Sequence, residues 1–191
     1  MPLPGGPADK AGNSFERRWT VFTLLDLLEG RAQSVRIEVP GDIGTGAEFR
    51  VMADGIAVWH QAKRQRDAGP WTIANMAAEG ILGPWWPKIQ DGGRCVFVSS
   101  TGAQELHELV ERASSANSWA EFDAEFLTGN QSARFRRLRS AWGDPAEKAV
   151  HQALGSIEVR LLGERDLAGY VEARLSSLVT GAPQTAAAVL A

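Results

Sequence analysis

The sequence predicts an α/β fold, in which a mixed β-sheet is flanked by helices and a helical extension follows on the C-terminal side. The chain has 191 residues with 44% hydrophobic content, which is enough to bury one sizeable core. In its first hundred residues, segments with the period of strands alternate with segments with the period of helices. The later part is mostly helical in pattern. Together these features favour a sheet with helices on its faces.

The two ends of the chain differ in composition from the middle. Residues 1–13 are rich in proline and glycine and have no apolar core of a signal peptide, so we expect a flexible lead-in. Residues 181–191 lose the amphipathic pattern, which is typical of a linker or a truncation point. Residues 14–180 are expected to form a single domain. No apolar run is long enough to span a membrane.

The first expected element is a helix over 14–29. Asn13 or Ser14 can cap it, and Glu16 lies in its first turn, where the helix dipole favours an acidic side chain. Gly30 ends it. Its apolar residues recur every three or four positions and form one stripe: Phe15, Trp19, Phe22, Leu25 and Leu28.

Two further segments have the alternating pattern of strands. "SVRIEV" over 34–39 places Val35, Ile37 and Val39 inward. Residues 47–63 read as a hairpin with the turn at Asp54-Gly55. On the second strand of this hairpin the alternation defines two faces, one with Ala57, Trp59, Gln61 and Lys63, the other with Val58, His60 and Ala62.

The remaining elements follow from shorter patterns. "RCVFVSS", which contains the single Cys95, is a nearly continuous apolar run and predicts a central strand covered on both faces. Thr101 is expected to cap the helix that follows. The other expected elements are helices over 72–79, 119–127, 133–142, 145–154 and 164–179, more helix after "GPWWP" as far as residue 90, and a strand over 156–162.

Charge and cysteine content exclude several classes of protein. A net charge of −3 and a pI near 5.7 exclude a globally basic nucleic-acid binder. Two local basic clusters remain, "KRQR" at 63–66 and "RFRRLR" at 134–139, and an ordinary solvated surface is the alternative for each.

A lone cysteine excludes a disulfide framework and multi-cysteine metal sites. A buried, reduced thiol suits a cytoplasmic protein.

The polar end of the strand over 56–63 carries the candidate chemistry. Cleavage of a phosphodiester needs a divalent metal held by hard oxygen ligands, and a lysine nearby can orient water or stabilise charge. Gln61 and Lys63 project from one face of the strand. Asp42, before the adjoining strand, is placed to reach the same point. This pattern indicates a metal-dependent site.

"PGD" ending at Asp42, "HQAK" at 60–63 and a first helix beginning "GNSFE" resemble the PD-(D/E)xK nuclease superfamily. More narrowly, the chain is similar to its Q-x-K variants, such as Mrr-like restriction enzymes and the nuclease domains of bacterial anti-phage defence proteins linked to cyclic-oligonucleotide signalling. The resemblance covers residues 12–113 and implies a restriction endonuclease-like sheet. Its motifs are short, and the order of helix, strand, hairpin, helix and strand gives them their weight.

Carried over residue by residue, the resemblance implies that Asp42 and Gln61 bind Mg²⁺ or Mn²⁺ and that Lys63 is the catalytic lysine. Glu38, four residues before Asp42, is a further ligand or supports one. Glu16 matches the acidic residue that some relatives place on the first helix, where it completes the metal site.

The chain departs from the family pattern at "GTG" after Asp42, so Glu48 is a reserve candidate if the strand register differs. Each residue also has an ordinary structural role as an alternative: Asp42 as a turn residue, Glu38 as an exposed strand residue, and Gln61 with Lys63 as a strand that runs into solvent. The histidines His60, His107 and His151 show no ligand spacing.

The function that the resemblance implies is a metal-dependent endonuclease acting on double-stranded DNA. It would be the N-terminal effector of a larger bacterial anti-phage defence protein, with a downstream sensor or ATPase module and a homo-oligomer on activation. One alternative is a catalytically inactive version of the fold that serves as a DNA-binding or protein-interaction scaffold, and another is an unrelated α/β domain. The arginines expected to hold the DNA backbone are Arg64, Arg66, Arg134, Arg136, Arg137 and Arg139.

Overall fold

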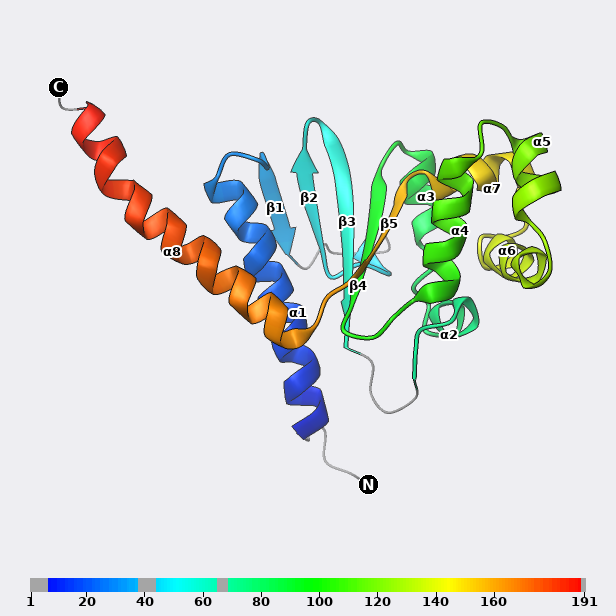
Figure 1. Cartoon of the computed structure of the whole chain (residues 1–191), viewed down its shortest axis with the longest axis horizontal. Coiled ribbons are helices and arrows are strands. Elements are labelled where there is room, and N and C mark those ends of the chain that lie inside the picture. Colours follow the sequence, from blue (N-terminus) through cyan, green and yellow to red (C-terminus); the bar gives the residue numbers. More distant parts are fainter. Residues whose placement is uncertain (1–6, 38–43, 65–68, 190–191) are drawn as a thin grey trace.

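A five-stranded mixed sheet forms the centre of the protein (Figure 1). The structure is a computed structural model that describes residues 7–37, 44–64 and 69–189, with the side chains of 14–37, 44–64 and 69–179. The strand order is β1-β2-β3-β4-β5, antiparallel from β1 to β3 and parallel from β3 to β5. The strands are β1 Ser34–Ile37, β2 Phe49–Ala53, β3 Ile56–Lys63, β4 Arg94–Ser99 and β5 Ile157–Leu161.

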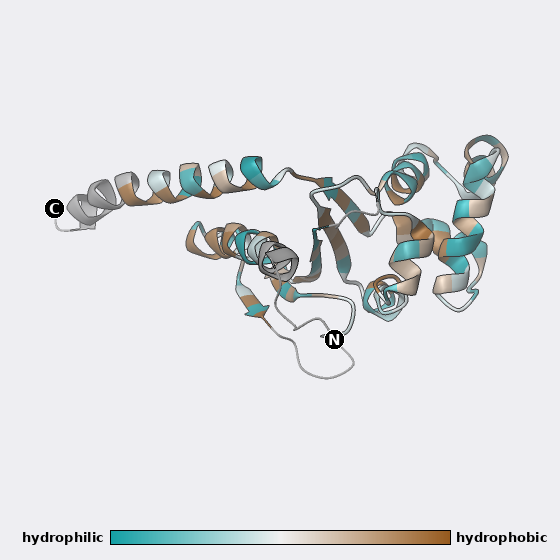
Figure 2. Cartoon of the chain, turned by 90° about the horizontal axis from the view of Figure 1, so that it is seen from below, coloured by the Kyte–Doolittle hydropathy of each residue, from teal (hydrophilic) through white to brown (hydrophobic). Residues whose placement is uncertain are grey.

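Helices cover both faces of this sheet, with α1 and α8 on one side and α2 to α7 on the other (Figure 2). The expected α/β class with a helical extension is therefore confirmed. One turn of π-helix, Phe122–Phe126, continues α5. The helices are α1 Pro7–Leu28, α2 Ile73–Ala78, α3 Trp85–Gln90, α4 Gln104–Ser115, α5 Trp119–Glu121, α6 Asn130–Ala141, α7 Glu147–Leu154 and α8 Glu164–Val189. No helix in these described ranges has both the length and the apolar character needed to cross a membrane.

The β2–β3 hairpin has the predicted turn and the predicted faces. Asp54 and Gly55 both have positive φ, 51° and 76°, as a tight hairpin turn requires. Trp59 packs in the core beneath α2 to α7, whereas Val58 and Ala62 pack in the core beneath α1 and α8. The alternation along β3 therefore assigns its side chains correctly.

The strand β4 is central, as expected. It pairs with β3 on one side and β5 on the other, and its residues from Cys95 to Ser99 are all buried. Cys95 and Phe97 face one core while Val96 and Val98 face the other. This explains why the segment is apolar at nearly every position.

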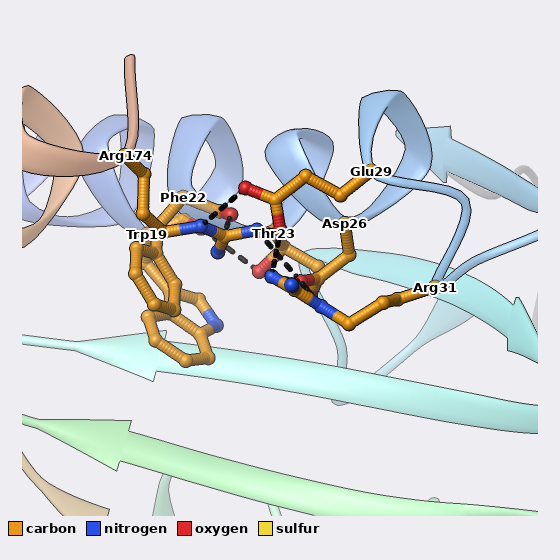
Figure 3. Close-up of polar contacts among 7 residues, drawn as sticks. All are labelled: Trp19, Phe22, Thr23, Asp26, Glu29, Arg31 and Arg174. Carbon is orange, nitrogen blue, oxygen red and sulfur yellow. Dashed lines mark hydrogen bonds and ion pairs between the residues drawn. The ribbon is translucent and has the colours of Figure 1, made fainter. Parts of the chain in front are cut away.

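An arginine on α8 joins this helix to α1 (Figure 3). The Arg174 guanidinium donates hydrogen bonds to Asp26 Oδ1 at 2.9 Å, to Glu29 Oε2 at 2.8 Å and to the Phe22 carbonyl oxygen at 2.9 Å. It also lies 4.5 Å from the centre of the Phe22 ring. Arg31 forms ion pairs with the same two carboxylates, so two cations share two anions at this junction.

Two helices are longer than expected. The helix α1 begins at Pro7, inside the stretch predicted to be a flexible lead-in. Proline is compatible with this position, since it is well tolerated in the first turn of a helix. The helix α8 continues to Val189, past the expected end near Val179 and through the segment read as a linker.

The cap predicted at Asn13 or Ser14 is wrong, because both residues lie inside α1. Two other local predictions are also wrong. Thr101 does not cap α4, which begins at Gln104 after Ala103; the Thr101 backbone N–H instead bonds to Ser99 Oγ at 3.2 Å. Ile37, predicted to point inward, is 50% exposed. It lies in β1, a four-residue strand at the edge of the sheet, where a neighbouring strand covers one side only.

Candidate active site

Side chains from three elements converge at the carboxyl end of β3. Glu48 directly precedes β2, and its backbone N–H donates to the His60 carbonyl oxygen at 2.8 Å, which places it beside Gln61. Gln61 and Lys63 project from one face of β3 because they are two residues apart. Glu16 comes from α1 and reaches the last residue of the strand, Lys63.

One carboxylate oxygen is the centre of these contacts. Glu48 Oε1 accepts a hydrogen bond from Gln61 Nε2 at 2.6 Å and another from Lys63 Nζ at 2.8 Å. Lys63 Nζ also lies 3.4 Å from Glu16 Oε1. Gln61 is only 4% exposed, whereas the charged side chains are partly open to solvent, so the site has a buried amide and an accessible charged rim.

The pKa values of two groups reflect this arrangement. Burial raises the pKa of Glu16 above its usual range, and the Glu48 charge adds to this, while the Lys63 ammonium opposes it. Burial lowers the pKa of Lys63, but its hydrogen bond to Glu48 and the charges of Glu48 and Glu16 outweigh burial, so the net pKa is raised. Lys63 is therefore a protonated, positively charged group at neutral pH.

The residues of this site fit a divalent cation by their chemistry. Two carboxylates and one ammonium leave one negative charge uncompensated when all three are ionised. The two carboxylates supply hard oxygens, and a half-turn of the Gln61 amide presents its oxygen where the nitrogen now lies. No group of three or more His, Cys, Asp and Glu suited to a metal occurs in the described part of the chain. A cation here would therefore depend on the Gln61 oxygen as well as on the carboxylates.

The structure brings together three of the residues that the sequence singled out. Glu16, Gln61 and Lys63 form one contact network, and the carboxylate that links them is Glu48, the reserve candidate. Asp42 and Glu38 lie outside the described residues, as does Arg66. The signal for Glu48 was available in the sequence, since alternation along "EFRVMA" places it on the face of β2 that adjoins Gln61.

Of the arginines predicted to bind DNA, Arg64 lies nearest to the site in sequence, and it forms an ion pair with Glu164 at the start of α8. The other cluster lies on α6, in the helical layer on the opposite side of the sheet from α1 (Figure 1). Within it, only Arg136 and Arg137 are exposed.

The two remaining arginines of α6 have structural partners. Arg134 donates to Glu108 Oε2 at 2.6 Å and thereby ties α6 to α4. Arg139 donates to the Pro145 carbonyl oxygen at 2.8 Å and to Glu147 at 3.2 Å. Both hold the helical layer together, so their charges are already compensated.

The histidines do not assemble a metal site. His60 is buried, accepts a hydrogen bond from Trp19 Nε1 at 3.3 Å through Nδ1, and stacks on Phe49 with ring centres 4.8 Å apart. His151 lies 4.7 Å from the Phe122 ring centre on the other side of the sheet. These histidines are parts of aromatic packing.

Comparisons with protein-family models, with curated proteins and with solved structures give no match for this chain. The interpretation of the site therefore depends on its own geometry. That geometry consists of two carboxylates, an amide and an ammonium at the end of a central strand.

Proposed function

We propose that this protein is a metal-dependent DNA endonuclease of the PD-(D/E)xK type, in its Q-x-K variant. The observation that carries the proposal is the meeting of Gln61 and Lys63 on one oxygen of Glu48. Such a nuclease needs a carboxylate before one strand. It also needs an amide and a lysine that lie two residues apart on the next strand.

The roles of the residues follow from their chemistry. Mg²⁺ or Mn²⁺, when bound, supplies charge neutralisation at the phosphate and an acidified water. Glu48 and Gln61 supply oxygen ligands, and Glu16 completes the set from α1. Asp42 and Glu38 remain predicted ligands from the segment before Gly44.

Lys63 is assigned a charge-stabilising role. Its raised pKa keeps the ammonium protonated at neutral pH, so it does not accept a proton from water in this state. A fixed ammonium beside the scissile phosphate stabilises the negative charge that develops as the phosphodiester is attacked. It also holds Glu48 in place through the 2.8 Å hydrogen bond.

The substrate in this proposal is double-stranded DNA, bound through its phosphates with little sequence readout. The exposed Arg136 and Arg137 are the freest cations of α6 for such contacts. We further propose a cytoplasmic effector module of a bacterial anti-phage defence protein, with a sensor or ATPase module downstream and assembly into a homo-oligomer on activation.

A catalytically inactive scaffold is the second candidate, and one observation favours it. Lys63 already lies between both carboxylates, and a glutamine stands where a nuclease of this type more often has an acidic ligand. In that case the same contacts would serve only to fix the end of β3 against α1.

Plasmid nicking separates the two candidates. Supercoiled DNA is incubated with Mg²⁺, Mn²⁺ or EDTA and with the wild type, Lys63→Met or the control Lys148→Met, which changes an exposed lysine on α7. The nuclease predicts metal-dependent nicking that Lys63→Met abolishes and Lys148→Met retains. Intact plasmid with the wild type in both metals, or nicking that survives Lys63→Met, contradicts the proposal.

Two further variants identify the acidic ligand. Glu48→Gln removes the carboxylate that contacts Gln61 and Lys63, and Asp42→Asn removes the one that the sequence motif favours. If Glu48 is the principal ligand, Glu48→Gln loses nicking and Asp42→Asn keeps a measurable rate. The opposite result assigns the role to Asp42.

A further inference from the structure

A cavity lies between the β2–β3 hairpin and α3, on the face of the sheet that α2 to α7 cover. Its volume is about 430 Å³, within the usual range of roughly 300–1,000 Å³ for small-molecule sites. Most of its surface is apolar, but two cations open onto it. The lining residues are Arg50, Ala57, Trp59, Pro84, Pro87, Lys88, Asp91 and Gly93.

Lys88 is a buried cation without an acidic partner in the described ranges. The residue is 6% exposed, and its ammonium lies 4.8 Å from the centre of the Trp59 ring. It donates one hydrogen bond, to the Thr45 carbonyl oxygen, although an ammonium has three hydrogens. The nearby Cys95 thiol supplies no charge, because burial raises its pKa to about 12. Burial also lowers the pKa of Lys88, which reflects the cost of holding this charge.

Arg50 lies over the same indole ring and has an unused donor. Its guanidinium carbon lies 5.5 Å from the centre of the Trp59 ring. Its Nε is buried and has no hydrogen-bond partner among the described residues. Asp91, the one acidic residue lining the cavity, is exposed and forms no ion pair with either cation in the part of the chain that the structure describes.

We propose that this cavity binds a small organic anion. Its carboxylate or phosphate group lies against Lys88 and Arg50, and its apolar part packs on Ala57, Pro84 and Pro87. Buried charges in proteins are normally paired, and an anion at this point supplies both cations with the partner that the described residues do not provide. The apolar walls exclude water, which strengthens each charged hydrogen bond to such a group. The proposal does not depend on nuclease activity, since none of these residues belongs to the candidate active site formed by Glu16, Glu48, Gln61 and Lys63.

Matched aromatic probes test the required charge. Benzoate and phenyl phosphate carry an anionic group on an apolar ring, and benzamide presents the same ring without charge. Binding is followed by NMR through the Trp59 indole N–H and the Gly93 amide. We expect saturable shifts with one or both anions and none with benzamide. The stronger of the two anions identifies the head group as a carboxylate or a phosphate.

Lys88→Met removes the charge and keeps most of the length of the side chain, with Lys148→Met as the control at an exposed lysine. We expect the Kd of the anion to rise at least about tenfold in Lys88→Met, the effect of one lost charged hydrogen bond, and to stay unchanged in Lys148→Met. We also expect a higher unfolding temperature for Lys88→Met, because an unpaired buried charge is replaced by an apolar group. If Lys88→Met does not fold, Arg50→Gln provides the same comparison.

Three results would each overturn the proposal. The first is the absence of saturable shifts with both anions in the wild type. The second is equal binding of benzamide and benzoate, which would show that the cavity recognises only the ring. The third is an unchanged anion Kd in a folded Lys88→Met or Arg50→Gln protein.

Discussion

The buried His60 makes the stability of this protein depend on pH in a way that one substitution can remove. His60 is 6% exposed, and its pKa is lowered from 6.5 to about 3, first by burial and then by the charge of Arg160. The imidazole is therefore neutral in the folded protein, and its Nδ1 accepts the Trp19 indole N–H. His60→Gln keeps an acceptor for this N–H but removes the titrating group.

The size of the effect follows from proton linkage. Below pH 6.5 the unfolded chain takes up a proton on this histidine that the folded protein does not bind. The free energy of unfolding is therefore greatest above pH 6.5 and falls as the pH decreases toward 3. Well inside this window the loss is about 1.4 kcal/mol for each pH unit. Between pH 6.5 and pH 4.5 the wild type is expected to lose about 2.3 kcal/mol through His60 alone.

Urea unfolding at several pH values from 7.5 to 4.5 measures this slope. We expect His60→Gln to have a lower stability at pH 7.5 but a flatter dependence on pH. His107→Gln, which changes a partly exposed histidine on α4, is the control and should keep the wild-type slope. Parallel curves for the wild type and His60→Gln would refute the reasoning, because they would show that His60 takes up its proton equally in both states.

Two other substitutions test the packing that positions the sites. Gly93→Ala places a Cβ 2.8 Å from the Lys88 carbonyl oxygen, so we expect the free energy of unfolding to fall by about 1–3 kcal/mol, measured by thermal unfolding. The control is Gly102→Ala, which should have little effect because nothing lies within 4 Å of the added Cβ. Arg174→Met removes the contacts of α8 with Asp26 and Glu29, so a protease should cleave α8 faster than in the wild type. Arg165→Met, which changes an exposed arginine of α8, is the control and should not change the cleavage rate. An unchanged unfolding temperature in Gly93→Ala, or unchanged cleavage in Arg174→Met, would contradict these assignments.

Local patterns predicted the elements that depend on neighbouring residues. The Asp54-Gly55 turn requires two positive φ values, which few residue pairs adopt, so the hairpin was visible in the sequence. The alternation along β3 gave the shared face of Gln61 and Lys63 for the same reason. The continuous apolar run of β4 marked the strand that both layers cover.

Contacts between distant segments were less accessible from the sequence. Asp42 was preferred because it ends a recognisable motif, yet Glu48 is the carboxylate that the structure places against Gln61 and Lys63. The register of β2 against β3, which the Asp54-Gly55 turn sets, decides this point, and the motif that ends at Asp42 carries no information about it. Lys88 gave no signal, because its neighbours in the sequence do not reveal that it packs on Trp59, 29 positions earlier.

The central claim is that Glu48, together with Gln61 and Lys63, holds a divalent metal. Titration of the protein with Mn²⁺, followed by electron paramagnetic resonance of the free ion, tests it without DNA or an activator. We predict one bound Mn²⁺ in the wild type and in the control Glu111→Gln, which changes an exposed glutamate on α4, and a large loss of affinity in Glu48→Gln. Equal Mn²⁺ binding by Glu48→Gln and the wild type, or no binding by the wild type, would contradict the account.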